Sequence, residues 1–133
     1  MSPRQLSANE NKNVDLLEKS LTREDVSKFL EPVSYEESFR FLDGTARPTG
    51  EIAISLSDFC SKIRTVSSES LLFHLKRNDF QEWIGEVIGD DELARRLNRI
   101  RVKNGVLRDT LHALISSRIQ ELKDSWSILL VLQ

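Results

Sequence analysis

The residues best suited to acid–base chemistry surround His74 in this chain of 133 residues. An imidazole titrates close to neutral pH, so it can act as a general base when a carboxylate orients it. Glu69 and Asp79 lie five residues before and after His74, and these three side chains are the candidates for a catalytic or small-molecule-binding site. However, Phe73 and Leu75 flank the histidine, and no nucleophile or metal ligand stands beside it. A structural histidine that bonds Asp79 or a helix-end carbonyl therefore explains the pattern better.

Two other kinds of reactive site receive weaker support. Cys60 is the single cysteine and could pair with His74 as nucleophile and base, but a lone cysteine in an apolar helix is usually buried. Asp90, Asp91 and Glu92 could hold a divalent cation, but acids that open a helix are explained by capping and the helix dipole. The two histidines lack zinc-site spacing, and the sequence has no P-loop or dinucleotide fingerprint. We therefore expect no cofactor and no metal.

A basic run follows these acids and is the best case for a weak nucleic-acid contact. Its candidate residues are Arg95, Arg96 and Arg99. Residues 90–123 contain eight basic and five acidic side chains, which leaves a small positive excess. Asp91 and Glu92 precede two of the arginines by four residues, which is typical of a solvated helix surface. No aromatic side chains are interleaved for base stacking, so nucleic-acid binding is disfavoured.

The overall composition favours a small globular domain. Hydrophobic residues make up 39% of the chain, charged residues 30%, and the net charge is −2. The N-terminus lacks the apolar run of a signal peptide, and no segment approaches the roughly 20 apolar residues of a membrane span. The chain has one cysteine, which excludes an internal disulfide. We therefore expect a cytoplasmic protein with a disordered tail over residues 1–13 and a single helical domain over residues 14–125.

The apolar periodicity predicts a mainly α fold, a compact bundle of about five helices with a minor β-hairpin near residues 38–55. The strongest helical pattern is Phe80, Trp83, Ile84, Val87 and Ile88, spaced as one buried helix face that Gly89 should end. The other helices are expected to begin at the caps Thr22, Ser55, Ser67 or Ser68, Asn78 or Asp79, and Asp90, with a last long helix from Leu107 to Leu122.

The pattern of residues 69–94 also resembles a known family. Glu69-Ser70, Phe73-His74, Asp79-Phe80, Trp83-Ile84 and Gly89-Asp90 followed by Glu92-Leu93-Ala94 are its matching motifs. They are similar to a small, mainly archaeal prokaryotic domain family of unknown function, over about residues 38–123. The resemblance implies a compact helical domain whose relatives occur alone or attached to larger proteins, including sugar-transferring enzymes. It implies no activity, cofactor or catalytic residue.

The last residues, 126–133, form the most apolar segment of the chain. As a strand, this segment would place Trp126, Ile128 and Leu130 on one face, and such a strand must be covered. It could dock within the monomer or onto a second copy, and these three residues are the apolar interaction candidates. Because capping and ion pairing explain most polar residues, we expect a non-catalytic protein-interaction or regulatory module. Its partner would be another protein or a second copy of this chain.

Overall fold

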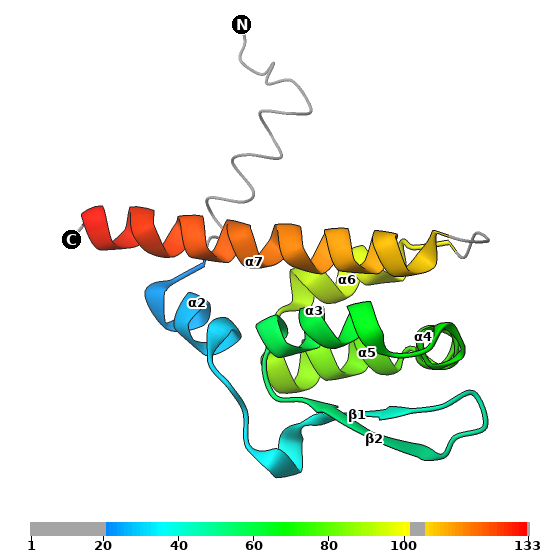
Figure 1. Ribbon diagram of the computed structural model, residues 1–133. Helices are drawn as coiled ribbons and strands as arrows, with labels where there is room; N and C mark the ends of the chain where they lie inside the picture. Colours follow the sequence, from blue (N-terminus) through cyan, green and yellow to red (C-terminus); the bar gives the residue numbers. More distant parts are fainter. Residues whose placement is uncertain (1–20, 102–105, 133) are drawn as a thin grey trace, which may run out of the picture.

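The computed structural model describes residues 21–101 and 106–132 (Figure 1). The predicted disordered tail, residues 1–13, lies outside the described residues. The described elements are α2 (Arg23–Leu30), η2 (Tyr35–Glu37), β1 (Phe39–Leu42), β2 (Pro48–Ala53), α3 (Leu56–Thr65), α4 (Ser68–Lys76), α5 (Asp79–Trp83), η3 (Ile84–Ile88), α6 (Asp91–Asn98) and α7 (Leu107–Val131). The mainly helical class and the small hairpin are confirmed, with six α-helices in these ranges rather than about five.

Most of the predicted helix starts are made by the expected capping side chains. Thr22 and Asp25 bond each other's backbone N–H groups in a complete capping box at α2. Ser55 and Ser67 accept backbone N–H groups at the starts of α3 and α4. Asn78 instead precedes α5 in the left-handed conformation, at φ 65°, without a side-chain cap. The local polar pattern therefore placed the helix starts well.

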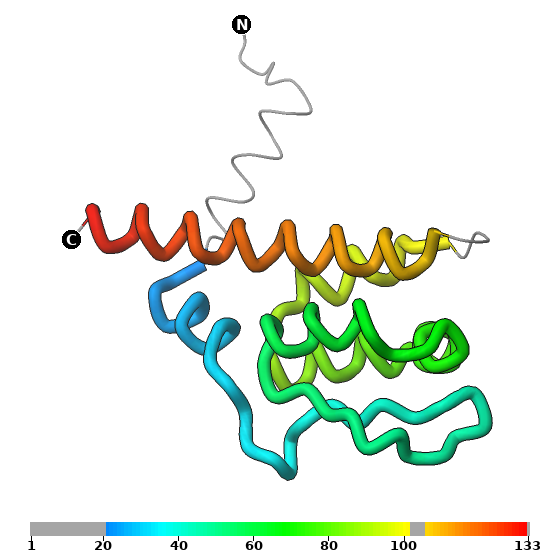
Figure 2. The backbone as a smooth tube through the Cα atoms, viewed as in Figure 1, coloured from blue at the N-terminus to red at the C-terminus, as the bar shows by residue number. Residues whose placement is uncertain are grey.

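The helices pack between the hairpin and the long helix α7 (Figures 1 and 2). Helix α7 runs across one side of the molecule, where it contacts α2, α3, α4 and α6. The antiparallel strands β1 and β2 lie on the opposite side, and an irregular register separates their pairs Arg40–Ile52 and Leu42–Pro48. The connection from α2 to β1 spans the two sides. The hairpin and α7 therefore close the core from opposite directions.

An aromatic cluster forms the part of the core beneath the hairpin. The ring centroids of Phe39 and Phe59 are 5.5 Å apart, and Phe59 lies 5.2 Å from Phe80 and 5.4 Å from Trp83. All four side chains are buried. Ile84 and Ile88 are buried as well, which confirms the helix face predicted around Trp83 except at Val87, which is only partly buried. Aromatic rings in such edge and tilted contacts supply large apolar burial with defined geometry. This cluster fixes β1 against α3 and α5.

The helix that carries Trp83 changes type after one turn. Residues Ile84–Ile88 form a π-helical turn, η3, in which the Gly89 N–H donates to the Ile84 carbonyl over 2.9 Å. Gly89 then ends the element at φ 95°, as predicted, because glycine tolerates that left-handed conformation. The wider turn was not predicted. It changes the direction in which the side chains of Glu86 and Val87 leave the helix.

The C-terminal segment corrects one prediction. Residues 126–131 continue α7 as helix, so the expected strand face of Trp126, Ile128 and Leu130 does not form. Leu122, Trp126 and Leu129 are spaced at i, i+4 and i+7 and pack toward the core, which explains why the helix continues. None of the helices in residues 21–101 and 106–132 combines the length and apolar character needed to cross a membrane.

Candidate functional site

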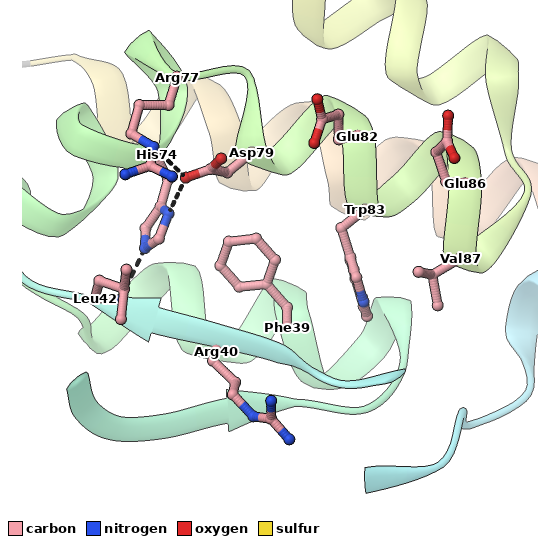
Figure 3. A pocket seen from close by; sticks show the side chains of 10 residues that line it. All are labelled: Phe39, Arg40, Leu42, His74, Arg77, Asp79, Glu82, Trp83, Glu86 and Val87. Atoms are coloured by element: carbon pink, nitrogen blue, oxygen red, sulfur yellow. Dashed lines mark hydrogen bonds and ion pairs between the residues drawn. The ribbon is translucent and has the colours of Figure 1, made fainter. Parts of the chain in front are cut away.

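A groove runs between the outer edge of β1 and the helical segment α5–η3 (Figure 3). Its volume is about 560 Å³. The apolar lining residues are Phe39, Leu42, Trp83 and Val87, and the polar lining residues are Arg40, His74, Arg77, Asp79, Glu82 and Glu86. Charged groups therefore border an aromatic and aliphatic floor, with the predicted site residue His74 at one end.

Both ring nitrogens of His74 have intramolecular partners (Figure 3). The Leu42 backbone N–H donates to Nε2 over 2.8 Å, so Nε2 must be unprotonated and Nδ1 carries the hydrogen of the neutral ring. Nδ1 donates that hydrogen to Asp79 Oδ2, also over 2.8 Å. Ser70 Oγ donates to the Leu42 carbonyl over 2.6 Å. His74 and Ser70 thus fasten the β1 edge to α4.

The electrostatics of His74 agree with this neutral, structural state. Burial lowers the pKa of His74 below its usual value of 6.5, and the nearby Asp79 carboxylate opposes that effect only in part. A general base needs a free lone pair within reach of substrate, but the lone pair on Nε2 accepts a backbone N–H. The arrangement orients β1 and leaves His74 without a nitrogen for proton transfer.

The other predicted catalytic candidates do not join His74 in one constellation. Glu69 is exposed in the first turn of α4 and does not line the groove, so only Asp79 meets the histidine. Cys60 is buried in α3, where its Sγ lies 4.0 Å from the His112 carbonyl. Burial raises the pKa of the Cys60 thiol, which disfavours the reactive thiolate. Within the described residues, no group of three or more metal-ligating side chains comes together.

The predicted nucleic-acid contacts are largely engaged in ion pairs. Arg96 forms a bidentate pair with Glu121, at 2.9 and 3.1 Å, and also bonds Glu92. Arg95 pairs with Glu92 as well, whereas Arg99 is exposed at the end of α6. These contacts join α6 to α7. They leave less free positive charge on this surface than the sequence indicates.

Groove residues that the sequence analysis missed include Arg40, Trp83 and Glu86. Trp83 was expected in the core, yet it also lines the groove and donates its indole N–H to the Glu37 carbonyl over 2.7 Å. Arg40 follows a buried residue in β1, and side chains alternate between the two faces of a strand. The sequence could therefore have predicted that Arg40 faces outward. Glu86 follows Glu82 by four residues, so ordinary helical spacing places both on the same side of the segment, a second signal that was available.

A family model matches most of the chain. The model of DUF5752, a family of unknown function, matches residues 1–120 of the chain. The chain belongs to this family. The predicted membership in a family of unknown function is thereby confirmed, and the match extends further toward the N-terminus than the expected residues 38–123. No curated protein and no solved structure matches significantly.

Membership in DUF5752 adds no reaction to the geometry. The matched residues include the whole groove and the His74–Asp79 pair, but they stop within α7. The apolar residues 126–132 therefore lie beyond the matched part of this DUF5752 member. Function has to be argued from surfaces and contacts.

Proposed function

We propose that this DUF5752 member is a non-catalytic protein-interaction module that docks through the apolar end of α7. The observation that carries the proposal is the exposure of four apolar side chains there: Ile128 at 59%, Leu130 at 46%, Val131 at 82% and Leu132 at 75%. The remaining exposed large apolar residues in the described ranges are Tyr35, which lies in η2, and Val106, which is the N-cap at the opposite end of α7. The apolar end of α7 is thus the main concentration of exposed apolar surface.

The final turn of α7, residues 128–131, is apolar on every side of the helix. Trp126 and Leu129 pack toward the core, while the four exposed residues point elsewhere. A helix that is apolar all round is normally buried, and contiguous exposed apolar patches commonly mark protein contacts. In Figure 1 this end of α7 extends past α2. It is therefore accessible to another molecule.

The occupant that we propose is the same helix end of a second copy. Two identical apolar helix ends can pack antiparallel about a two-fold axis, because apolar surfaces require no matching charges. Four partly exposed side chains offer much less than the roughly 800 Å² per partner of a standard interface. We therefore expect a weak dimer whose population depends on protein concentration.

The observed side-chain contacts favour catalysis and nucleic-acid binding less. His74, the best candidate for a general base, has both nitrogens engaged with Asp79 and Leu42. Arg96, at the centre of the basic run, is engaged with Glu92 and Glu121. Catalysis and nucleic-acid binding would both have to displace these intramolecular bonds first.

Sedimentation velocity over a range of protein concentrations tests the proposal. The parent chain should increase in mean mass with concentration, and Val131→Glu should remain monomeric because it buries a charge in the contact. Ser116→Glu, at an exposed position near the middle of α7, is the matched control and should behave as the parent. A parent that stays monomeric to roughly millimolar concentration, or a Val131→Glu variant that associates equally well, would refute the proposal.

A further inference from the structure

The groove between β1 and α5–η3 carries negative charge that nothing in the described chain neutralises. Glu82 and Glu86 are exposed and form no ion pair or side-chain hydrogen bond with any residue in 21–101 or 106–132. They stand four residues apart on one helical segment, and Figure 3 shows both carboxylates on the same side of it. Figure 3 also shows that both carboxylates are directed away from β1, whereas Trp83 and Val87 face it, so the two free carboxylates stand at the outer rim of the groove.

The two arginines that line the groove are committed to other partners. Arg40 donates to the Tyr35 carbonyl over 3.3 Å, and its guanidinium lies 4.9 Å from the centroid of the Tyr35 ring. Arg77 pairs with Asp79 at 3.3 Å and lies 4.8 Å from the centroid of the Phe73 ring. Arg77 and Asp79 cancel each other, whereas Arg40 keeps its charge, so the lining carries three acidic and two basic side chains and a net charge of −1. The excess negative charge lies at Glu82 and Glu86, and there the groove complements a positively charged ligand.

The strand that borders the groove has a short open edge. Among the residues that the structure describes, β1 pairs only with β2, on one of its two sides. His74 and Ser70 occupy the outward N–H and C=O groups of Leu42. The irregular register adds its extra residues on β2, since Arg40 and Leu42 are two residues apart and their partners Ile52 and Pro48 are four apart. The intervening Phe41 directs its carbonyl to Thr49 on β2, so Arg40, like Leu42, presents its N–H and C=O to the outer edge. An extended peptide could pair there.

We infer that the groove binds an extended basic segment of another protein. Its backbone pairs with Arg40 on the open edge of β1, as in strand addition to a sheet. Its lysine or arginine side chains reach Glu82 and Glu86, and its alternate apolar side chains contact the floor near Val87. The π-helical turn η3 carries both Glu86 and Val87, so it shapes the wall that the peptide meets.

The probe for this site is an acetylated, amidated hexapeptide that alternates arginine with valine. Its binding to the full chain is followed by the NMR shifts of the Arg40 amide and the Trp83 indole N–H, which border the groove. We expect both signals to move together with a saturable curve, and to move less as salt is added. The same hexapeptide with glutamate in place of arginine should produce no saturable shift.

Paired variants separate this site from general charge attraction. Glu82→Gln combined with Glu86→Gln should weaken binding roughly fivefold, the effect of losing two exposed ion pairs. Glu24→Gln combined with Asp109→Asn removes the same charge at exposed positions outside the groove, and binding should stay unchanged. Each single substitution should have an intermediate effect, which guards against an unfolded double variant.

Three results would overturn the inference. They are no saturable binding up to roughly millimolar peptide, equal weakening by the two double variants, and shifts that avoid Arg40 and Trp83. The Val131→Glu variant should bind the peptide as the parent does, since α7 lies on the opposite side of the molecule (Figure 1). Loss of peptide binding in Val131→Glu would contradict the separation of the two surfaces.

Discussion

Asp90 and Arg118 form a bidentate ion pair in which both side chains are almost completely buried. Arg118 Nε lies 2.8 Å from Asp90 Oδ2, and Arg118 Nη2 lies 2.9 Å from Asp90 Oδ1. Oδ1 also accepts the Leu93 N–H at the start of α6, and Arg118 reaches Glu121. One carboxylate therefore starts α6 and binds this helix to α7.

Substitution of Asp90 should destabilise the fold strongly. Asp90→Asn keeps a capping oxygen but removes the buried counter-charge of Arg118, which retains only the more exposed Glu121 as an ion-pair partner. Breaking a buried pair in this way typically costs about 3–5 kcal/mol. Urea unfolding followed by circular dichroism measures the change. Asp91→Asn, at the exposed neighbouring position, is the control and should cost much less. A loss below about 1 kcal/mol for Asp90→Asn would show that the pair is not needed.

Trp83 should be the most sensitive position in the aromatic cluster. Trp83→Ala removes a buried ring and the hydrogen bond to the Glu37 carbonyl, so unfolding free energy should fall by about 3–5 kcal/mol. Trp83→Phe keeps an aromatic ring but loses the indole N–H, and it should lie between the parent and alanine. Calorimetric melting compares the three proteins. An alanine variant that melts within a degree or two of the parent contradicts the assigned core.

His74 should make stability depend on pH in the acid range. Because burial lowers its folded-state pKa below 6.5, the unfolded chain binds the proton more readily between the two pKa values. The contribution of His74 to the free energy of unfolding is therefore fully present above about pH 6.5. It falls as the pH decreases toward the folded-state pKa, and below that pKa it no longer changes. Protonation would also place a hydrogen on Nε2, so that it could no longer accept the hydrogen bond from the Leu42 N–H.

Urea unfolding of the parent and His74→Gln at several pH values between 5 and 7.5 tests this dependence. The variant should be less stable at pH 7.5 and should lose less stability on acidification than the parent does. Its self-association at neutral pH should be unchanged, since His74 lies away from the end of α7. Identical pH slopes for the two proteins would contradict the contribution assigned to His74.

Local sequence signals identified the parts of the fold that depend on neighbouring residues. Thr22, Ser55 and Asp90 cap helices where they were expected to, because a capping oxygen needs only an N–H group two or three residues later. The contacts of His74 with Leu42 and of Asp90 with Arg118 span 32 and 28 residues. Such pairs depend on how helices pack, which a local pattern does not specify.

The C-terminal segment shows how an apolar run can mislead. A short run of consecutive apolar residues fits both a strand and a helix, and the strand interpretation of residues 126–132 was wrong. The helical spacing of Leu122, Trp126 and Leu129 continues the core face of the preceding residues and was the decisive signal. That continuation is also what leaves Ile128 and Val131 outside the core.

Cysteine cross-linking at Ile128 tests most directly whether the apolar ends of α7 meet. In a two-fold contact between these ends, Ile128→Cys lies close to its own counterpart, whereas Ser116→Cys on the same helix does not. Both variants carry Cys60→Ser to remove the native thiol. Under mild oxidation we expect Ile128→Cys to form a covalent dimer much faster than Ser116→Cys. Equal, slow dimer formation by the two variants would contradict self-association through this helix end.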